Sequence, residues 1–180
     1  MSNVKLRPRT AADPDGLKLI THGDKRTEAA LDAIDQALQK NLDKAKNPTQ
    51  RRIAKNMLQE FRKIRNNTQK PIPINPSSKP NQWNPVNPFD NNQDETIDWN
   101  PDCETGGKAD KDGRRPPYVG LAHEISHAMD YVFSRGAYAS PNNPKYAPNR
   151  GEERALDFEN AVRNGAGLPR RESYWDNIIK

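Results

Sequence analysis

Cysteine, histidine and long apolar runs are scarce in this sequence, and each scarcity narrows what the protein can be. The chain of 180 residues has one cysteine, Cys103, so it cannot form an internal disulfide, and we expect this residue to be structural or incidental. No segment approaches the roughly 18 apolar residues of a membrane span. The first 20 residues also lack the apolar stretch of an ordinary secretory signal. We therefore expect no membrane association and no disulfide framework.

Apolar residues are few overall. They make up 32% of the chain beside 16 prolines, which predicts one loop-rich domain with a modest core on a few helices. Basic residues outnumber acidic ones by 29 to 24, so the net charge is +5. Because acidic residues are interleaved with the basic ones, we expect a solvated surface and no nucleic-acid partner.

The N-terminal third of the chain predicts a helical hairpin. Residues 1–23 are polar, include His22 as an expected surface residue, and predict a flexible lead-in to a single domain over 24–180. Apolar residues recur at helical spacing over 27–45 and again from Pro48 to about residue 65, where Asn47 and Gln50 can cap the second helix. We expect these two stripes to be core: Leu31, Ile34, Leu38 and Leu42, then Ile53, Met57, Phe61 and Ile64. The hairpin would occupy residues 24–68 and a second part residues 69–180.

Prolines dominate the start of that second part. Between residues 69 and 102 they exclude a helix and any long central strand: Pro71, Pro73, Pro76, Pro80, Pro85, Pro88 and Pro101. Residues 95–99 alternate in polarity and predict one short strand. Two further helices are predicted, over 116–135 and over 151–164.

The most informative motif lies in the first of these two helices. His123 and His127 are one turn apart on one helical face, so both imidazoles can reach a single zinc ion. Glu124 is placed to act as general base on water without occupying the metal. The chain has three histidines, and two of them are in this pattern. The motif predicts a metallopeptidase site, so the part over 69–180 is expected to be catalytic.

No histidine follows His127, so the third metal ligand is expected to be a carboxylate of the last helix. We favour Glu153, with Glu152 and Glu159 as alternatives. Asp157, four residues after Glu153, would then accept a proton from a ligand histidine.

Peptide hydrolysis also needs a group that stabilises the developing oxyanion. Arg171 and Tyr174 provide a cation and a phenol three residues apart near the C-terminal end of the sequence. From their chemistry alone, a role at the site and a place in a surface turn are equally good interpretations.

Together these residues resemble a known family, the NleD-like effector metallopeptidases, which bacteria inject into host cells. The similarity covers about residues 95–175 and rests on the following set: Gly120 to Ala128, Glu152, Glu153, Glu159, Asn160, Arg163, Gly167-Leu168-Pro169, Arg171 and Tyr174. The family is in turn similar to clostridial neurotoxin light chains. The resemblance implies Glu153 as third zinc ligand and Arg171 with Tyr174 as transition-state stabilisers. Ile125 and Ser126 depart from the usual motif, which puts the substrate preference in doubt.

The sequence thus predicts an α+β, zincin-like domain, mostly helical, with a small sheet and long Pro/Asn-rich loops. It would be a monomeric zinc endopeptidase that a bacterium secretes and that acts in the host cytoplasm on a host protein, for which the resemblance implies a signalling kinase. Two alternatives remain: a peptidase toxin used between bacteria, and a non-catalytic binding module with structural zinc.

Overall fold

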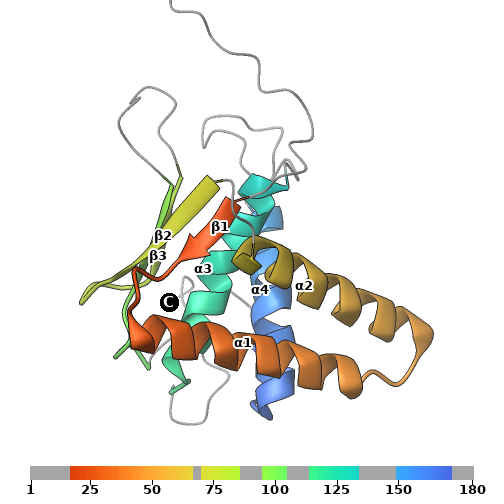
Figure 1. Ribbon diagram of the computed structural model, residues 1–180. Coiled ribbons are helices and arrows are strands. Elements are labelled where there is room, and N and C mark those ends of the chain that lie inside the picture. Colours follow the sequence, from red (N-terminus) through yellow and green to blue (C-terminus); the bar gives the residue numbers. More distant parts are fainter. Residues whose placement is uncertain (1–16, 67–69, 86–94, 105–113, 134–148, 172–180) are drawn as a thin grey trace, which may run out of the picture.

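The computed structural model describes residues 17–66, 70–85, 95–104, 114–133 and 149–171 (Figure 1). Long helices predominate and a small sheet accompanies them, which confirms the α+β prediction. The elements run as follows: β1 Leu17–Ile20, α1 Lys25–Asp43, α2 Pro48–Asn66, β2 Lys70–Pro76, β3 Gln82–Asn84, β4 Thr96–Trp99, α3 Pro117–Val132 and α4 Asn149–Ala166. Among these residues, no helix is long and apolar enough to cross a membrane.

The four strands form one mixed sheet in the order β1-β2-β4-β3. β2 is parallel to both neighbours, and β3 is antiparallel to β4 at the edge. Only β4 was predicted from the sequence. β1 also corrects the expected flexible lead-in, because Leu17–Ile20 pair with β2; residues 1–16 lie outside the described part.

The proline-rich β2 shows that the exclusion of a central strand was wrong. Its two neighbours use different halves of the strand: β1 pairs with residues 70–73 and β4 with residues 74–76. Pro71 and Pro73 are two residues apart, so their nitrogens face the same side of the strand. Each half of β2 pairs with a neighbouring strand on one side only. The proline nitrogens, which carry no hydrogen, can therefore face the unpaired side, and few hydrogen bonds between the strands are lost.

The helices largely confirm the sequence pattern. α1 and α2 match the predicted hairpin, and the side chain of Asn47 accepts a hydrogen bond from Gln50 N at 2.9 Å as predicted. α3 ends at Val132, three residues before the predicted end, while α4 extends about two residues beyond the prediction at each end. At its C-terminus Gly167 adopts a positive φ, and Leu168 N donates to Arg163 O at 2.9 Å, which closes a Schellman motif.

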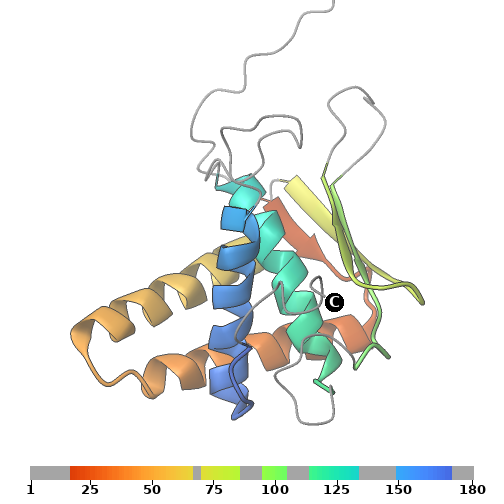
Figure 2. The ribbon, with the colours of Figure 1, turned by 180° about the vertical axis from the view of Figure 1, so that it is seen from behind.

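Helix α3 occupies the middle of the molecule, between the sheet and α4, and α1 crosses below both (Figures 1 and 2). The part of α3 from Val119 to Asp130 is buried apart from half-buried Glu124. α1 and α4 approach closely at Gly165, where an added Cβ would lie 1.7 Å from the carbonyl oxygen of Ala37. The centre of the fold is therefore the helix that carries the His-Glu-x-x-His motif.

The predicted core residues are buried with one clear exception. Leu31, Ile34, Leu38, Phe61 and Ile64 are buried, while Leu42 and Met57 pack at the margin of the core. Ile53 instead has 49% of its surface exposed, so its assignment to the core was wrong. Ile53 lines a groove that residues of α4 also line, including Asp157 and Ala161.

Candidate metal centre

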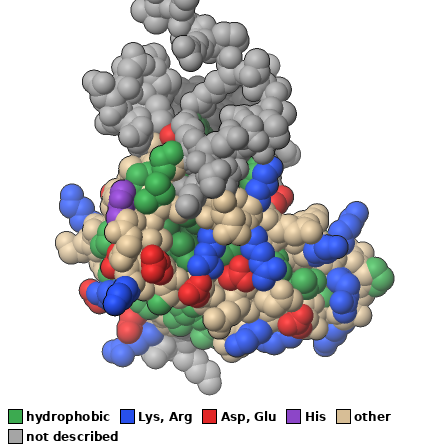
Figure 3. Space-filling view, in the orientation of Figure 1, with side chains coloured by type: hydrophobic (Ala, Val, Ile, Leu, Met, Phe, Trp, Pro, Cys, Tyr) green, Lys and Arg blue, Asp and Glu red, His purple; other side chains and the backbone are tan. Residues whose placement is uncertain are grey.

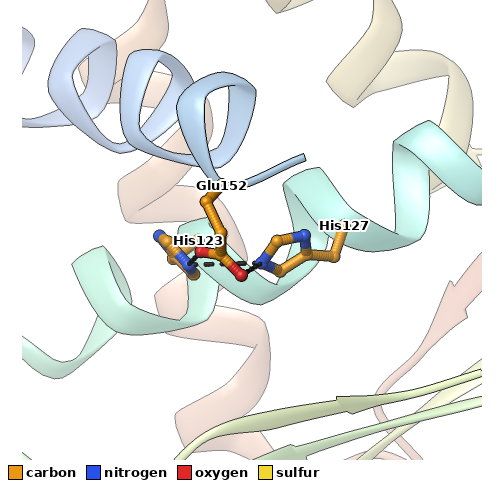
Figure 4. A group of neighbouring side chains, drawn as sticks. All are labelled: His123, His127 and Glu152. Carbon is orange, nitrogen blue, oxygen red and sulfur yellow. Dashed lines mark hydrogen bonds and ion pairs between the residues drawn. The ribbon is translucent and has the colours of Figure 1, made fainter. Parts of the chain in front are cut away.

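Three side chains from two helices converge in the interior. His123 and His127 come from α3, and Glu152 comes from the first turn of α4 (Figure 4). The two Nε2 atoms are 3.3 Å apart, and the Glu152 carboxylate oxygens lie 3.2 Å from His123 Nε2 and 3.5 Å from His127 Nε2. A tetrahedral zinc ion with ligands at about 2.0–2.1 Å separates its ligand atoms by about 3.3–3.4 Å. The two Glu152 distances go to different oxygens, Oε2 for His123 and Oε1 for His127. One donor atom from each of the three side chains lies within 4.8 Å of the other two, which is close enough for the group to hold one metal ion after small side-chain movements.

Glu152, which the sequence left as an alternative, faces the two histidines, whereas the favoured Glu153 does not. Glu153 is exposed to solvent. At about 100° per residue, Glu153 lies roughly 140–200° around α4 from the buried residues Ala155, Phe158 and Val162, so it points away from the core. The sequence already contained this signal, since the apolar stripe fixes which side of the helix turns inward.

The metal-free cluster is strongly polarised. Burial lowers the pKa of His123, but hydrogen bonds to Glu152 and Glu159 outweigh it and raise that pKa to about 9. Burial likewise raises the pKa of Glu152, yet its hydrogen bonds to His123 and His127 bring it down to about 2. At neutral pH His123 is therefore protonated and Glu152 is ionised, so a proton occupies the place where a metal cation would be attracted.

A second carboxylate, Glu159, lies behind His123 and is completely buried. Its Oε2 is 3.2 Å from His123 Nδ1, and since a carboxylate only accepts, this ring nitrogen must be the donor. Three guanidinium groups also donate to Glu159: Arg115 at 3.0 Å, Arg163 at 2.9 Å and Arg171 at 3.0 Å. Burial raises the pKa of Glu159, but the bond to His123 and the charge of Arg115 lower it to about 2.

Asp157 does not have the predicted position beside a histidine. Its side chain is 61% exposed and lies 3.8 Å from Arg170, whose side chain is 74% exposed. Glu152 and Glu159 are seven residues apart, which is within about 20° of two full helical turns, so they share one face of α4. Asp157 lies about 140° around the helix from Glu152 and therefore points elsewhere.

Arg171 reaches the site through a short backbone connection. After the turn at Gly167, the Asn160 side chain accepts from Arg171 N at 2.8 Å and donates to Arg171 O at 2.9 Å. This two-bond clamp holds the buried Arg171 beside Glu159, which also contacts His123. Tyr174 lies outside the described residues.

Two other residues singled out in the sequence, Glu124 and Cys103, are half-buried. Glu124 is half-buried next to His123 on α3, and its negative charge contributes to the raised pKa of that histidine. Cys103 is half-buried beyond the end of β4. The sequence motif did not reveal the roles of Arg115 and Asn160, because their partners are 44 and 11 residues away along the chain.

Over residues 24–174 the sequence matches the model of a peptidase family, Peptidase_M91, described as "effector protein". The matched range begins just before α1 and includes the three clustered side chains, Arg171 and Tyr174. No curated protein and no solved structure matches the chain.

Proposed function

Because the chain belongs to the Peptidase_M91 family of bacterial effector peptidases, we propose that it is a zinc-dependent endopeptidase that cleaves a host protein. This family match confirms the resemblance to the NleD-like metallopeptidases. The observation that carries the proposal is the convergence of His123, His127 and Glu152, whose donor atoms, one from each side chain, lie within 4.8 Å of one another. Three protein ligands leave the fourth position of a tetrahedron for water or substrate, which is the arrangement of catalytic zinc sites. A structural zinc module would instead be expected to use four protein ligands.

The proposed ligands are His123, His127 and Glu152. Bound there, zinc would act as a Lewis acid on the peptide carbonyl and lower the pKa of water to about 7. Glu124, one residue after the first ligand, would take the proton from the attacking water and deliver it to the leaving amine. Its half-buried position leaves it access to solvent.

Glu159 takes the orienting role that we had predicted for Asp157. By holding the proton of His123 on Nδ1, its carboxylate leaves Nε2 free to face the metal. Arg171 donates a hydrogen bond to the same carboxylate, so Glu159 connects the Arg171 guanidinium to the proposed metal ligand His123. We propose that Arg171 stabilises the oxyanion, together with Tyr174 from the segment that follows.

The effector family supports action inside a host cell, and we propose delivery by the bacterium into the host cytoplasm. A signalling kinase is the substrate class that the sequence resemblance implies. We expect the enzyme to act as a monomer, without a nucleic-acid or membrane requirement.

Zinc content provides the first test. Wild-type protein should carry about one zinc per chain, and Glu152→Gln should lose most of it. Glu153→Gln is the matched control, since it removes the neighbouring carboxylate from the exposed side of the same helical turn. Loss of zinc in Glu153→Gln with retention in Glu152→Gln would reverse the ligand assignment.

Substrate cleavage provides the second test. Wild type and Glu124→Gln should each be incubated with host-cell lysate, and new protein N-termini identified by mass spectrometry. Glu124→Gln should retain zinc and yield no new N-termini. A zinc-loaded wild type that produces none either would refute the endopeptidase proposal.

A further inference from the structure

The net positive charge of the chain is concentrated at one end of the helical hairpin. Residues 40–55, here called the hairpin tip, contain six basic residues and one acidic residue, Asp43. Since the whole chain has 29 basic and 24 acidic residues, 23 of each remain elsewhere and cancel. The six cations are all exposed: Lys40, Lys44, Lys46, Arg51, Arg52 and Lys55. Figure 3 shows Lys and Arg side chains on this end of α1 and α2, at the right of the view.

A groove of about 800 Å³ lies between the hairpin tip and α4. Its apolar lining includes Ile53, Met57, Ala161 and Leu168, among them the one large hydrophobic side chain that is exposed in the described part of the protein. The polar lining includes the cations Lys44, Lys46 and Arg170 and a single acidic residue, Asp157. At one end, Lys44 Nζ donates to Asn164 O at 2.5 Å and links α1 to α4.

The groove and the metal centre lie on different faces of α4. Measured from Glu152 at about 100° per residue, Glu159 lies near 0°, whereas Asp157, Ala161 and Asn164 lie at roughly 120–180°. The helix therefore lies between the groove and the three clustered side chains, while Asn160, at about 80°, lines the groove and also holds Arg171. A molecule in the groove would not occupy the metal centre, but a longer chain could engage both.

Because apolar and basic side chains line the same groove beside the basic hairpin tip, we propose that this groove docks an acidic, amphipathic segment of the protein substrate, remote from the bond that is cut. This proposal rests on the proposed peptidase function. Leucine-like side chains on one face of such a helix would pack against Ile53 and Met57, and its carboxylates would meet Lys44 and Lys46. The groove volume suits a few side chains, not a folded domain.

Two other anionic partners fit the groove less well. Single-stranded nucleic acid is held by stacking on aromatic side chains, and none of the described lining residues is aromatic. A membrane surface is bound by a broad apolar face on a helix, whereas Ile53 alone among the described large hydrophobic residues is exposed.

Fluorescence anisotropy tests the proposal with defined probes and full-length Glu124→Gln protein in zinc-containing buffer. One labelled peptide of about 15 residues, some four helical turns, carries Leu on one face and Glu on the other. A second peptide replaces every Glu by Lys. The Glu peptide should bind, and more weakly as salt rises, while the Lys peptide should not. Failure of the Glu peptide to bind would overturn the proposal.

Matched variants localise the binding. Lys46→Glu should raise the Kd of the Glu peptide about fivefold or more, whereas Lys25→Glu, an exposed residue at the start of α1, changes net charge equally and should have little effect. Ile53→Ser should raise the Kd about tenfold, because it removes the exposed apolar contact. Equal effects of Lys46→Glu and Lys25→Glu, an unchanged Kd in Ile53→Ser, or tighter binding to phosphatidylserine vesicles or to a single-stranded oligonucleotide would overturn the proposal.

These measurements separate this proposal from the proposed enzymatic function. If the protein holds zinc and cleaves host proteins but does not bind the Glu peptide, the docking proposal fails and the peptidase stands. If the peptide binds as predicted but the protein holds no zinc and cleaves nothing, the peptidase proposal fails, and with it the identification of the docked segment as substrate.

Discussion

Replacing Glu159 by Gln should test the centre of the site most sharply. Glu159 is completely buried and is the common acceptor for His123 and for Arg115, Arg163 and Arg171. A neutral amide at this position removes the negative charge that these three guanidiniums share. Removing one partner of a buried ion pair costs about 3–5 kcal/mol, a large share of the roughly 5–15 kcal/mol that stabilises a domain.

The same change should weaken metal binding. An amide no longer enforces a proton on His123 Nδ1, and loss of such an outer partner lowers metal affinity about 10–100-fold. Urea denaturation of the metal-free protein measures the first effect, and competition with a chromophoric zinc chelator measures the second. Asp157→Asn is the control, because its exposed side chain lies on another face of α4 and should change neither quantity.

The pH dependence gives an independent check on Glu159. Its pKa in the folded protein is lowered to about 2 from an ordinary value of 4.5. A lowered pKa means that ionised Glu159 contributes stability above about pH 4.5 and that this contribution is lost as pH falls towards 2. The difference in unfolding free energy between wild type and Glu159→Gln should therefore shrink below pH 4.5. The reasoning is refuted if Glu159→Gln matches wild type in both stability and zinc affinity, or if Asp157→Asn weakens zinc binding equally.

Two further predictions follow from other parts of the structure. In metal-free protein the His123 pKa of about 9 exceeds its ordinary 6.5, so the contribution of protonated His123 to stability is complete below pH 6.5 and is lost as pH rises through 9. Zinc binding at pH 7 should therefore release about one proton, which calorimetry in buffers of different ionisation enthalpy measures. The absence of proton release would contradict the assignment of His123 as a ligand. Gly165→Ala should destabilise the protein by about 2 kcal/mol or more despite the better helix propensity of Ala, because its Cβ would lie 1.7 Å from the Ala37 backbone. Urea denaturation measures this effect, and a midpoint equal to that of wild type would show that α1 and α4 can separate without cost.

Local sequence patterns were sufficient for the helices and for the central motif. The spacing of Leu31, Ile34 and Leu38 predicts α1, and Asn47 with Pro48 marks the start of α2, since capping and amphipathic period act within a few residues. His123 and His127 share a face by helical geometry alone. The outward orientation of Glu153 was also within reach, because the stripe of Ala155, Phe158 and Val162 orients α4.

Tertiary structure decided what joins distant parts of the chain. β1 and the proline-rich β2 form strands because each supplies the other's hydrogen-bond partners, which no local propensity records. Arg115 and Arg171 meet at Glu159 only once α3 packs on α4 and the turn at Gly167 folds back. The groove beside Ile53 likewise exists only where the hairpin tip meets α4. A helical period fixes which side chains share a face, whereas the partner of that face depends on how the whole chain buries its few apolar residues.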